Sequence, residues 1–191
     1  MKTINIDVDL CVVNPLWNYA KWIDNFIPEE HKFDVMECIE QLGYRHFDGM
    51  ESIVREWRPE FRCLDYWERG DIYDDILPIP YSDLYINQLH SDGYKINFVS
   101  HCCGKPHVES KLRFLSQFFK YDGFYDTGDK YTVPCDIMID DRPEYLYPMC
   151  KHQPHAHLFL YETPTNCNDY KEGLDIVSDW KTIYSRIKTN Y

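Results

Sequence analysis

The chain has 191 residues, of which 44% are hydrophobic and 16% aromatic, so its composition is that of a globular protein and not of a disordered one. Its 32 acidic and 20 basic residues give a formal net charge of −12, which argues against a long polyanion such as DNA or an anionic membrane surface as partner. A small phosphorylated substrate stays compatible with this charge if a few cations converge locally. The length predicts one domain, with room for an inserted subdomain.

Apolar runs in the sequence are short, so we expect neither a membrane span nor a signal peptide and place the protein in the cytoplasm, which is the host cytoplasm if the chain is viral. Eight cysteines are scattered through a chain too large to need disulfide staples, which favours reduced thiols. A homodimer is compatible with the sequence, but nothing in it fixes the oligomeric state.

The first predicted element is a β-strand over residues 3–6, in which Ile4 and Ile6 alternate with polar neighbours. Asp7 and Asp9 follow this strand. Because the side-chain period of a strand is two, both carboxylates leave on the same side at its carboxyl end. Two acids this close repel each other unless a cation or a shared proton relieves them. A lone Asp-x-Asp is also typical of a solvated turn, so the rest of the chain decides its meaning.

Helical spacing replaces the strand pattern between residues 14 and 77. Two of the helices expected there end before Gly43 and before Pro59, which are common stop signals. We therefore predict a small helical cap at residues 14–77, inserted into a core made of residues 1–13 and 78–191. The predicted helices of the cap cover residues 16–26, 35–42, 50–57 and 61–68.

The core continues with alternating helices and strands. Ser82 is predicted to cap a helix that stops at Gly93, and the strand at 95–99 ends at Ser100. A strand, a helix and a strand joined in this way imply a parallel sheet, so the fold class is α/β, a Rossmann-like parallel sheet flanked by helices. Pro106 is predicted to open a helix with a buried stripe of Val108, Leu112, Leu115 and Phe119. The remaining elements are strands at 124–127, 136–139 and 157–161 and a closing helix over 177–187.

Three of these strands deliver polar groups at their carboxyl ends: Asp7 with Asp9, Ser100, and Asp140 with Asp141. A parallel sheet gathers such ends along one edge, so the groups are expected to meet in one crevice. Carboxylates and a hydroxyl in one place suit Mg²⁺, which takes oxygen ligands and typically uses one or two carboxylates plus a substrate phosphate. An aspartate can attack phosphorus and form an aspartyl-phosphate, while its neighbour two residues on protonates the leaving alkoxide.

A transferring phosphoryl group also needs a hydroxyl donor and a lysine. Ser100 supplies the hydroxyl, and Lys130 or Lys111 the cation. We favour Lys130, because Lys111 lies on the predicted helix after Pro106 and fits an exposed helix lysine. His101, directly after Ser100, is a further phosphate-binding candidate.

These motifs resemble a known family. Asp7-Val8-Asp9, the strand that ends at Ser100, a lysine, and Ile139-Asp140-Asp141 match in order the four motifs of the haloacid dehalogenase (HAD) superfamily of phosphotransferases. More narrowly, the chain is similar to the 5′(3′)-deoxyribonucleotidases, through softer matches at Trp67-Glu68, Leu77-Pro78-Ile79-Pro80 and Asp129-Lys130. The resemblance extends over almost the whole chain.

The resemblance implies a Mg²⁺-dependent phosphatase of (deoxy)ribonucleoside monophosphates, with pyrimidine deoxynucleotides as the expected substrates. Asp7 would then be the nucleophile and Asp9 the general acid and base. Mg²⁺ would be held by Asp7, Asp9 through its backbone carbonyl, and Asp141, with Asp140 close by.

The same resemblance assigns phosphate binding to Ser100 and Lys130. It also makes the helical insertion a cap over the site, in which Trp67 and Tyr73 correspond to aromatic positions that contact the base. Both aromatic residues fit packing inside the cap equally well.

Other interpretations stay open at this point. The same chemistry on another small phosphomonoester needs only a different cap pocket, and a catalytically silent binding module could keep the fold. Base preference and the choice between 5′ and 3′ phosphate are not fixed. A zinc site at Cys150, His152, His155 and His157 is disfavoured, because their spacing fits no common structural site.

Overall fold

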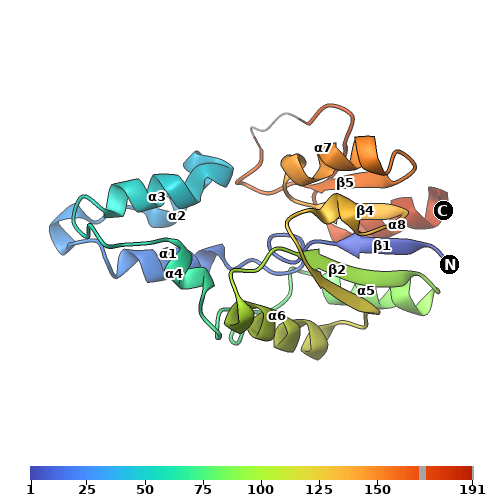
Figure 1. Ribbon diagram of the computed structural model, residues 1–191, viewed down its shortest axis with the longest axis horizontal. Coiled ribbons are helices and arrows are strands. Elements are labelled where there is room, and N and C mark those ends of the chain that lie inside the picture. The colour runs from blue at the N-terminus through green and yellow to red at the C-terminus, as the bar shows by residue number, and fades with distance from the viewer. Residues whose placement is uncertain (168–170, 191) are drawn as a thin grey trace.

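A six-stranded parallel sheet forms the centre of the computed structural model, which describes residues 1–167 and 171–190 (Figure 1). The strand order is β3-β2-β1-β4-β5-β6, and every neighbouring pair is parallel. The central strands are buried on both faces, as the runs of Ile, Phe and Val in them require. The predicted α/β class is therefore confirmed. The strands are β1 (Thr3–Ile6), β2 (Lys95–Ser100), β3 (Gly123–Asp126), β4 (Ile137–Asp140), β5 (His157–Tyr161) and β6 (Asp175–Val177).

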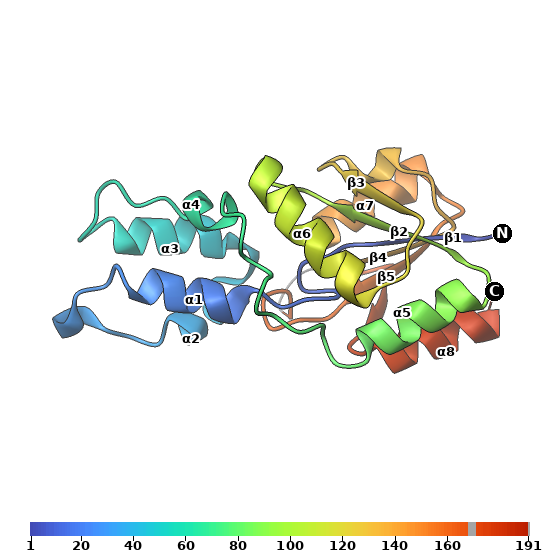
Figure 2. The same ribbon diagram turned by 90° about the horizontal axis from the view of Figure 1, so that it is seen from below.

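Helices cover both faces of this sheet. Helices α5 (Ser82–Ser91) and α8 (Trp180–Asn190) lie side by side on one face, and α7 (Pro143–His152) lies on the other (Figure 2). Helix α6 (Lys105–Phe118) connects β2 to β3. Trp180 of α8 is fully buried, and its indole N–H donates to the carbonyl of Cys11 at 2.8 Å, which ties the end of the chain to the loop after β1.

The remaining α-helices stand at one end of the molecule, away from the sheet (Figure 2). They belong to the segment of residues 14–77, which we call the cap. The predicted boundaries of this segment stay a prediction. At the junction, Val13 forms isolated bridges with Asp9 and Pro78, so the two connections run side by side. The cap contains α1 (Leu16–Asp24), α2 (Val35–Leu42), α3 (His46–Val54) and α4 (Leu64–Trp67), with short 3₁₀ turns at Glu29–His31 and Gly43–Arg45.

Both ends of helix α2 in the cap are set by specific residues. Asp34 caps its N-terminus by accepting from the backbone N–H of Glu37 at 3.0 Å. Gly43 ends it with φ of +60°, and a Cβ there would lie 2.8 Å from the carbonyl oxygen of Thr165 in the core. Only glycine meets both demands, so Gly43 is where the cap backbone approaches the core most tightly.

Several local predictions were wrong. Ser82 does not cap α5; it is buried inside the first turn with its hydroxyl 3.4 Å from the carbonyl of Val12, and Tyr81 at φ of +65° precedes the helix. Val177 lies in β6 and not in the last helix, which begins at Trp180. Strand β6 and helix α7 were not predicted, because β6 has three residues and α7 carries Pro148 in its interior.

The buried side of α6 also differs from the prediction. Leu115 and the nearby Phe119 are buried, but Val108 and Leu112 are only half-buried. Part of the buried face of α6 is polar instead. Its buried polar side chains are His107, Ser110 and Lys111. The helix therefore packs a polar face toward the carboxyl ends of the strands.

All eight cysteines are free, as the sequence predicted. Across residues 1–167 and 171–190, no helix is both long and apolar enough to cross a membrane.

Candidate active site

The carboxyl ends of β1, β2 and β4 meet at one edge of the sheet. Ile6, the last residue of β1, is in register with Phe98 of β2 and with Ile139 of β4. The next residue, Asp7, donates its backbone N–H to the carbonyl of Ile139 at 2.9 Å. The acidic tips of β1 and β4 therefore lie next to each other, and Ser100 ends the neighbouring strand. The predicted convergence of these three segments is what the structure shows.

Lys130 binds two of the converging carboxylates. Its ammonium lies 2.8 Å from Asp7 Oδ1 and 2.6 Å from Asp140 Oδ2, and the residue is 2% exposed. Burial alone would lower the pKa of Lys130, but Asp140 and Asp7 outweigh it and raise the pKa above its ordinary value. The lysine is therefore charged and neutralises part of the acidic cluster. It is placed there by the short 3₁₀ turn at Lys130–Thr132.

Asp141 is the carboxylate that Lys130 does not reach. It is 4% exposed, and its side chain makes no hydrogen bond or ion pair with the part of the chain that the structure describes. Burial, together with the charges of Asp140 and Asp7, raises its pKa well above the ordinary value, although Lys130 and Arg142 act in the opposite direction. A buried acid in this state needs either a proton or a cation.

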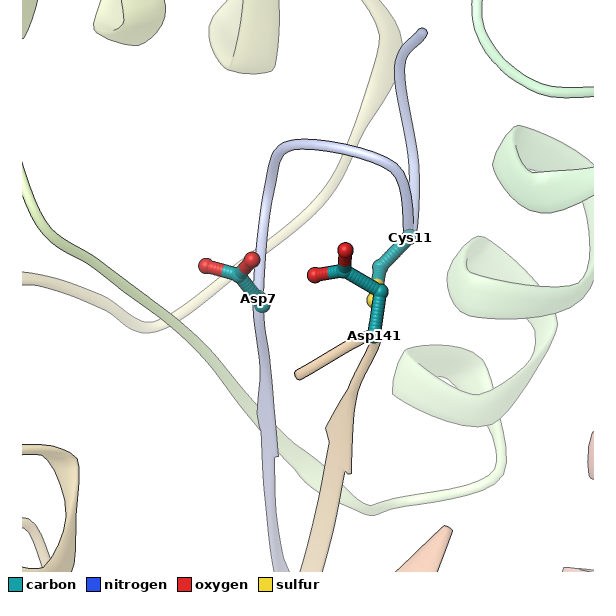
Figure 3. A group of neighbouring side chains, drawn as sticks. All are labelled: Asp7, Cys11 and Asp141. Carbon is teal, nitrogen blue, oxygen red and sulfur yellow. The ribbon is translucent and has the colours of Figure 1, made fainter. Parts of the chain in front are cut away.

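The arrangement of the acids fits a metal ion. Ligand atoms of Asp7, Cys11 and Asp141 lie within 4.8 Å of one another, the only such group among the described residues, and the carboxylate of Asp141 points toward Asp7 (Figure 3). Burial raises the pKa of the Cys11 thiol well above its usual value, so the sulfur is a poor ligand for a hard cation. The donor set therefore fits Mg²⁺ through Asp7 and Asp141.

The other two predicted metal ligands use their carboxylates elsewhere. Asp140 accepts from Lys130 and from the backbone N–H of Arg142 at 3.0 Å. Asp9 is engaged by Lys111, at 2.8 Å, and by the hydroxyl of Tyr73, at 2.6 Å. Its side chain therefore points away from a metal held by Asp7, and a contact through its backbone carbonyl stays a prediction.

A chain of hydrogen bonds holds Asp9. The backbone N–H of Cys103 donates to His107 Nδ1 at 3.1 Å, so the ring proton sits on Nε2, which lies 2.9 Å from the Tyr73 oxygen. Tyr73 in turn donates to Asp9. Burial would raise the pKa of Asp9, but Lys111, His107 and Tyr73 together lower it below its ordinary value. Asp9 is thus held as a carboxylate, the form in which it can accept a proton.

Lys111 is not an exposed helix lysine, and that interpretation was wrong. Its side chain is 0% exposed, and its ammonium donates to Ser100 Oγ at 2.8 Å as well as to Asp9. The two lysines contact different residues of the site: Lys130 pairs with Asp7, whereas Lys111 pairs with Asp9 and donates to Ser100. Of the two, Lys130 lines the adjoining cavity and Lys111 does not.

A cavity of about 230 Å³ lies between the strand ends and the cap. Its core wall includes the predicted residues Asp7, Asp9, Ser100, His101, Lys130 and Asp141. Trp67 lies in its cap wall, and its predicted contact with a base stays a prediction. Tyr73 does not line the cavity; its predicted contact with a base stays a prediction, and the hydroxyl already binds Asp9 and His107.

Several lining residues were missed by the sequence analysis. On the cap side they include His46 and Phe47, which follow the glycine stop of α2 and carry no motif. On the core side Arg142 and Tyr145 line the cavity from the start of α7, an element that was not predicted. Among the described residues, the ligand atoms of the His and Cys residues between 150 and 157 do not come together in a group that could hold a metal ion.

Comparison with known proteins found similarity in structure alone. No protein-family model and no curated protein sequence matched the chain. A HAD family hydrolase from Deinococcus radiodurans R1, with bound phosphate and sodium, has a TM-score of 0.67 at 13% identity and covers 99% of this chain and 96% of its own. The D,D-heptose 1.7-bisphosphate phosphatase from B. bronchiseptica, complexed with magnesium and phosphate, has a TM-score of 0.52 at 11% identity, with 100% of both chains covered. A dehalogenase with an intermediate complex has a TM-score of 0.64 at 12% identity and covers 97% and 96%.

The chain has the haloacid dehalogenase fold. In this HAD-like fold the cavity lies where the carboxyl ends of β1, β2 and β4 meet the inserted helices. The similar structures are hydrolases and phosphatases by name. Because their sequence identity to this chain is low, the similarity shows the fold and does not identify a substrate.

Proposed function

We propose that this protein is a Mg²⁺-dependent phosphatase that hydrolyses nucleoside monophosphates, pyrimidine deoxynucleotides in particular, through an aspartyl-phosphate intermediate. The observation that carries the proposal is the pair Asp7 and Asp141, both buried, with ligand atoms within 4.8 Å of each other in the wall of a cavity that Lys130 also lines. A buried acidic cluster with one lysine bonded to only part of it favours a divalent cation, because the cation relieves the excess negative charge, and the added positive charge then favours a phosphate.

The residues of the core wall supply each step of this reaction. Asp9 first takes up a proton from solvent. An oxygen of Asp7 attacks phosphorus, the bond from phosphorus to the leaving oxygen breaks, and Asp9 passes this proton to the leaving oxygen. Asp9 then takes a proton from water, which attacks the phosphorus, so that the acyl-phosphate bond breaks and Asp7 is regenerated with release of inorganic phosphate. Lys130 and the Ser100 hydroxyl stabilise the phosphoryl charge. Asp7 and Asp141 would hold Mg²⁺, which would supply further positive charge to the transferring phosphoryl group.

The cap wall supports a neutral, ring-bearing leaving group. Every cap residue in the cavity wall is uncharged, and most are apolar or aromatic: Pro15, Leu16, Tyr44, His46, Phe47, Leu64 and Trp67. The volume of about 230 Å³ lies below the range of roughly 300–1,000 Å³ that holds drug-sized ligands. A single ring on a deoxyribose suits such a space better than a second charged phosphate or a two-ring base.

The test is phosphate release from a panel of esters, with and without Mg²⁺. The panel pairs deoxyuridine and thymidine monophosphates with their ribonucleotide and purine counterparts, with sugar phosphates, and with phenyl phosphate as an ester without a sugar. We expect Mg²⁺-dependent release that is fastest for the pyrimidine deoxynucleotides. Preference for sugar phosphates would keep the chemistry and replace the substrate class, and no release from any ester would leave a silent binding module.

A further inference from the structure

The side chain of Asp9 is held by groups from two separate segments of the chain. Lys111 of α6 donates to Oδ2, and the hydroxyl of Tyr73 donates to Oδ1 at 2.6 Å. Asp9 lines the cavity and its side chain is 25% exposed, whereas Tyr73 is buried and does not line the cavity. The tyrosine therefore contacts Asp9 from outside the cavity and leaves part of the acid exposed there.

His107 sets the direction of the Tyr73 hydroxyl. Because its Nδ1 accepts from the backbone N–H of Cys103, its Nε2 carries the proton and donates to the tyrosine oxygen at 2.9 Å. The tyrosine oxygen thus accepts one hydrogen bond, and its own proton is left for Asp9. The two rings also stack, with centroids 5.8 Å apart and planes inclined by 24°. The histidine therefore fixes both the place of the tyrosine ring and the direction in which its hydroxyl donates.

Tyr73 is itself held by the attachment of its segment to α6. Its backbone N–H donates to Ser110 Oγ at 3.3 Å. Arg113 of the same helix donates to the carbonyl of Gly70 and to the carboxylate of Asp74, which lie on either side of the tyrosine in the sequence. Tyr73 therefore belongs to the cap by its place in the sequence, but its contacts fasten it to a helix of the core. A side chain fixed at so many points can hold its partner in one geometry.

We propose that Tyr73 and His107 form a positioning pair for the proton transfers of Asp9. A carboxylate bound by Lys111 alone can rotate toward that lysine and Ser100, whereas a second hydrogen bond at its other oxygen fixes its plane. Asp9 then meets the leaving oxygen, and later the attacking water, from one defined direction. Both residues of the pair act through Asp9. The inference rests on the proposed function, because it assigns a role within that reaction, but it does not depend on which phosphate ester is the substrate.

The dependence of the rate on the leaving group tests the pair. An alkoxide needs a proton as it leaves, whereas 4-nitrophenolate is stable without one. Because kcat/KM includes only the steps up to departure of the leaving group, it reports this proton transfer and not the later attack of water. The two probes are 4-nitrophenyl phosphate and the nucleotide or sugar phosphate that the wild-type protein hydrolyses fastest. Tyr73→Phe removes only the hydroxyl, and we expect it to lower kcat/KM for the alkyl ester by about 10–100-fold and for 4-nitrophenyl phosphate by less than about threefold.

Two variants of His107 and a matched control complete the design. His107→Leu removes the donor to the tyrosine oxygen and should lower kcat/KM for the alkyl ester alone, by about tenfold. His107→Gln keeps an N–H donor there and should restore most of that loss. Tyr184→Phe is the control, because it deletes a hydroxyl that also binds an aspartate, Asp92, at 3.1 Å, in a residue that does not line the cavity; both values of kcat/KM should stay unchanged. Melting curves establish that each variant is folded, and the His107 variants carry the test if Tyr73→Phe is not.

The outcomes separate this pair from the proposed function. An equal fall of kcat/KM for both esters in Tyr73→Phe means a structural role, and no fall for either means no role; both results overturn the pair and leave the phosphatase standing. If the expected pattern is found with a sugar phosphate and no nucleotide is hydrolysed, the pair stands and the nucleotide substrate falls. Wild-type turnover of 4-nitrophenyl phosphate alone overturns the pair, because no leaving group is then protonated. If the wild-type protein hydrolyses no ester, the reaction and the pair fall together.

Discussion

The two walls of the cavity differ in chemistry and in what holds them. The core wall carries every charged side chain of the cavity, on strand ends and the turns next to them. The cap wall carries none, and aromatic rings from different helices make up much of it. On the proposed function, a phosphate and a metal ion would be bound at the core wall, and the shape and polarity of the leaving group would be selected at the cap wall. Reaction and selection would then reside in different walls of the cavity.

The walls also differ in their energetic needs. Three buried acids lie in or behind the core wall, and Lys130 pairs with Asp7 and Asp140 but not with Asp141, which leaves negative charge in excess. The cap wall has the milder problem of two buried polar atoms, on a histidine and a tryptophan, that have no hydrogen-bond partner among the described residues. Substitutions in the core wall should therefore have large effects on both turnover and stability, and those in the cap wall should alter selectivity.

The largest effect is expected from Asp7→Asn. An amide oxygen is a poor nucleophile, so turnover of every substrate, phenyl phosphate included, should fall by about 10⁴-fold or more. The fold should persist, because the change removes one charge from an acidic cluster and leaves Lys130 its bond to Asp140. Phosphate release measures the loss of turnover, and a melting curve shows whether the variant is folded.

Two companions sharpen the comparison of the walls. Asp129→Asn alters an exposed acid beside Lys130 and should leave turnover unchanged. Phe47→Leu alters the cap wall and should change the ratio of nucleotide to phenyl phosphate turnover far more than the Mg²⁺ requirement. Retained turnover in Asp7→Asn would remove Asp7 from the nucleophilic role.

The next effect concerns the buried lysines. Lys130→Met leaves Asp7 and Asp140, whose side chains are 7% and 0% exposed, without their cation and should lower the free energy of unfolding by about 3–5 kcal/mol. Lys111→Met should cost less, about 1–3 kcal/mol, because Asp9 is 25% exposed and keeps its bond to Tyr73. Urea unfolding at neutral pH compares them. Equal losses of unfolding free energy would contradict the prediction that Lys130 contributes more stability than Lys111.

Much of the core wall was predictable from the sequence, because its acids follow short apolar strands whose alternation sets direction and register. Asp7, Ser100 and Asp141 could be placed at one edge from parallel pairing alone. The burial of Lys111 could not, since its neighbours on α6 read as an ordinary amphipathic stripe while its partners are distant in sequence. Helical periodicity predicted the cap helices but not which rings line the cavity, as shown by Tyr73, which binds Asp9 instead.

The stability gained on binding Mg²⁺ should depend on the core wall and not on the cap wall. Mg²⁺ at one hundred times its dissociation constant should add about 2.7 kcal/mol to the free energy of unfolding, provided that it binds only the folded chain. Asp141→Asn should abolish this gain, because it removes one of the two carboxylates whose oxygens lie close enough to hold one ion. Trp67→Phe, in the cap wall, should keep it. Melting curves with Mg²⁺ and with chelator measure the shift, and an undiminished gain in Asp141→Asn would place the ion elsewhere.

The smallest effect tests the neutral state of the cap wall. The pKa of His46 is lowered by burial to about 4, against about 6.5 in an unfolded chain, so the unfolded state takes up a proton first as the pH falls. The stability contributed by the neutral ring is complete above pH 6.5 and is lost between that pH and 4. From pH 6.5 to 5.5 this loss amounts to about 1 kcal/mol of the free energy of unfolding.

Over this interval, His46→Phe should lose about 1 kcal/mol less stability than the wild-type protein. The control variant His155→Gln, at an exposed position, should show the same change of stability with pH as the wild-type protein. Parallel slopes for all three proteins in urea titrations would mean that folding does not lower the pKa of His46.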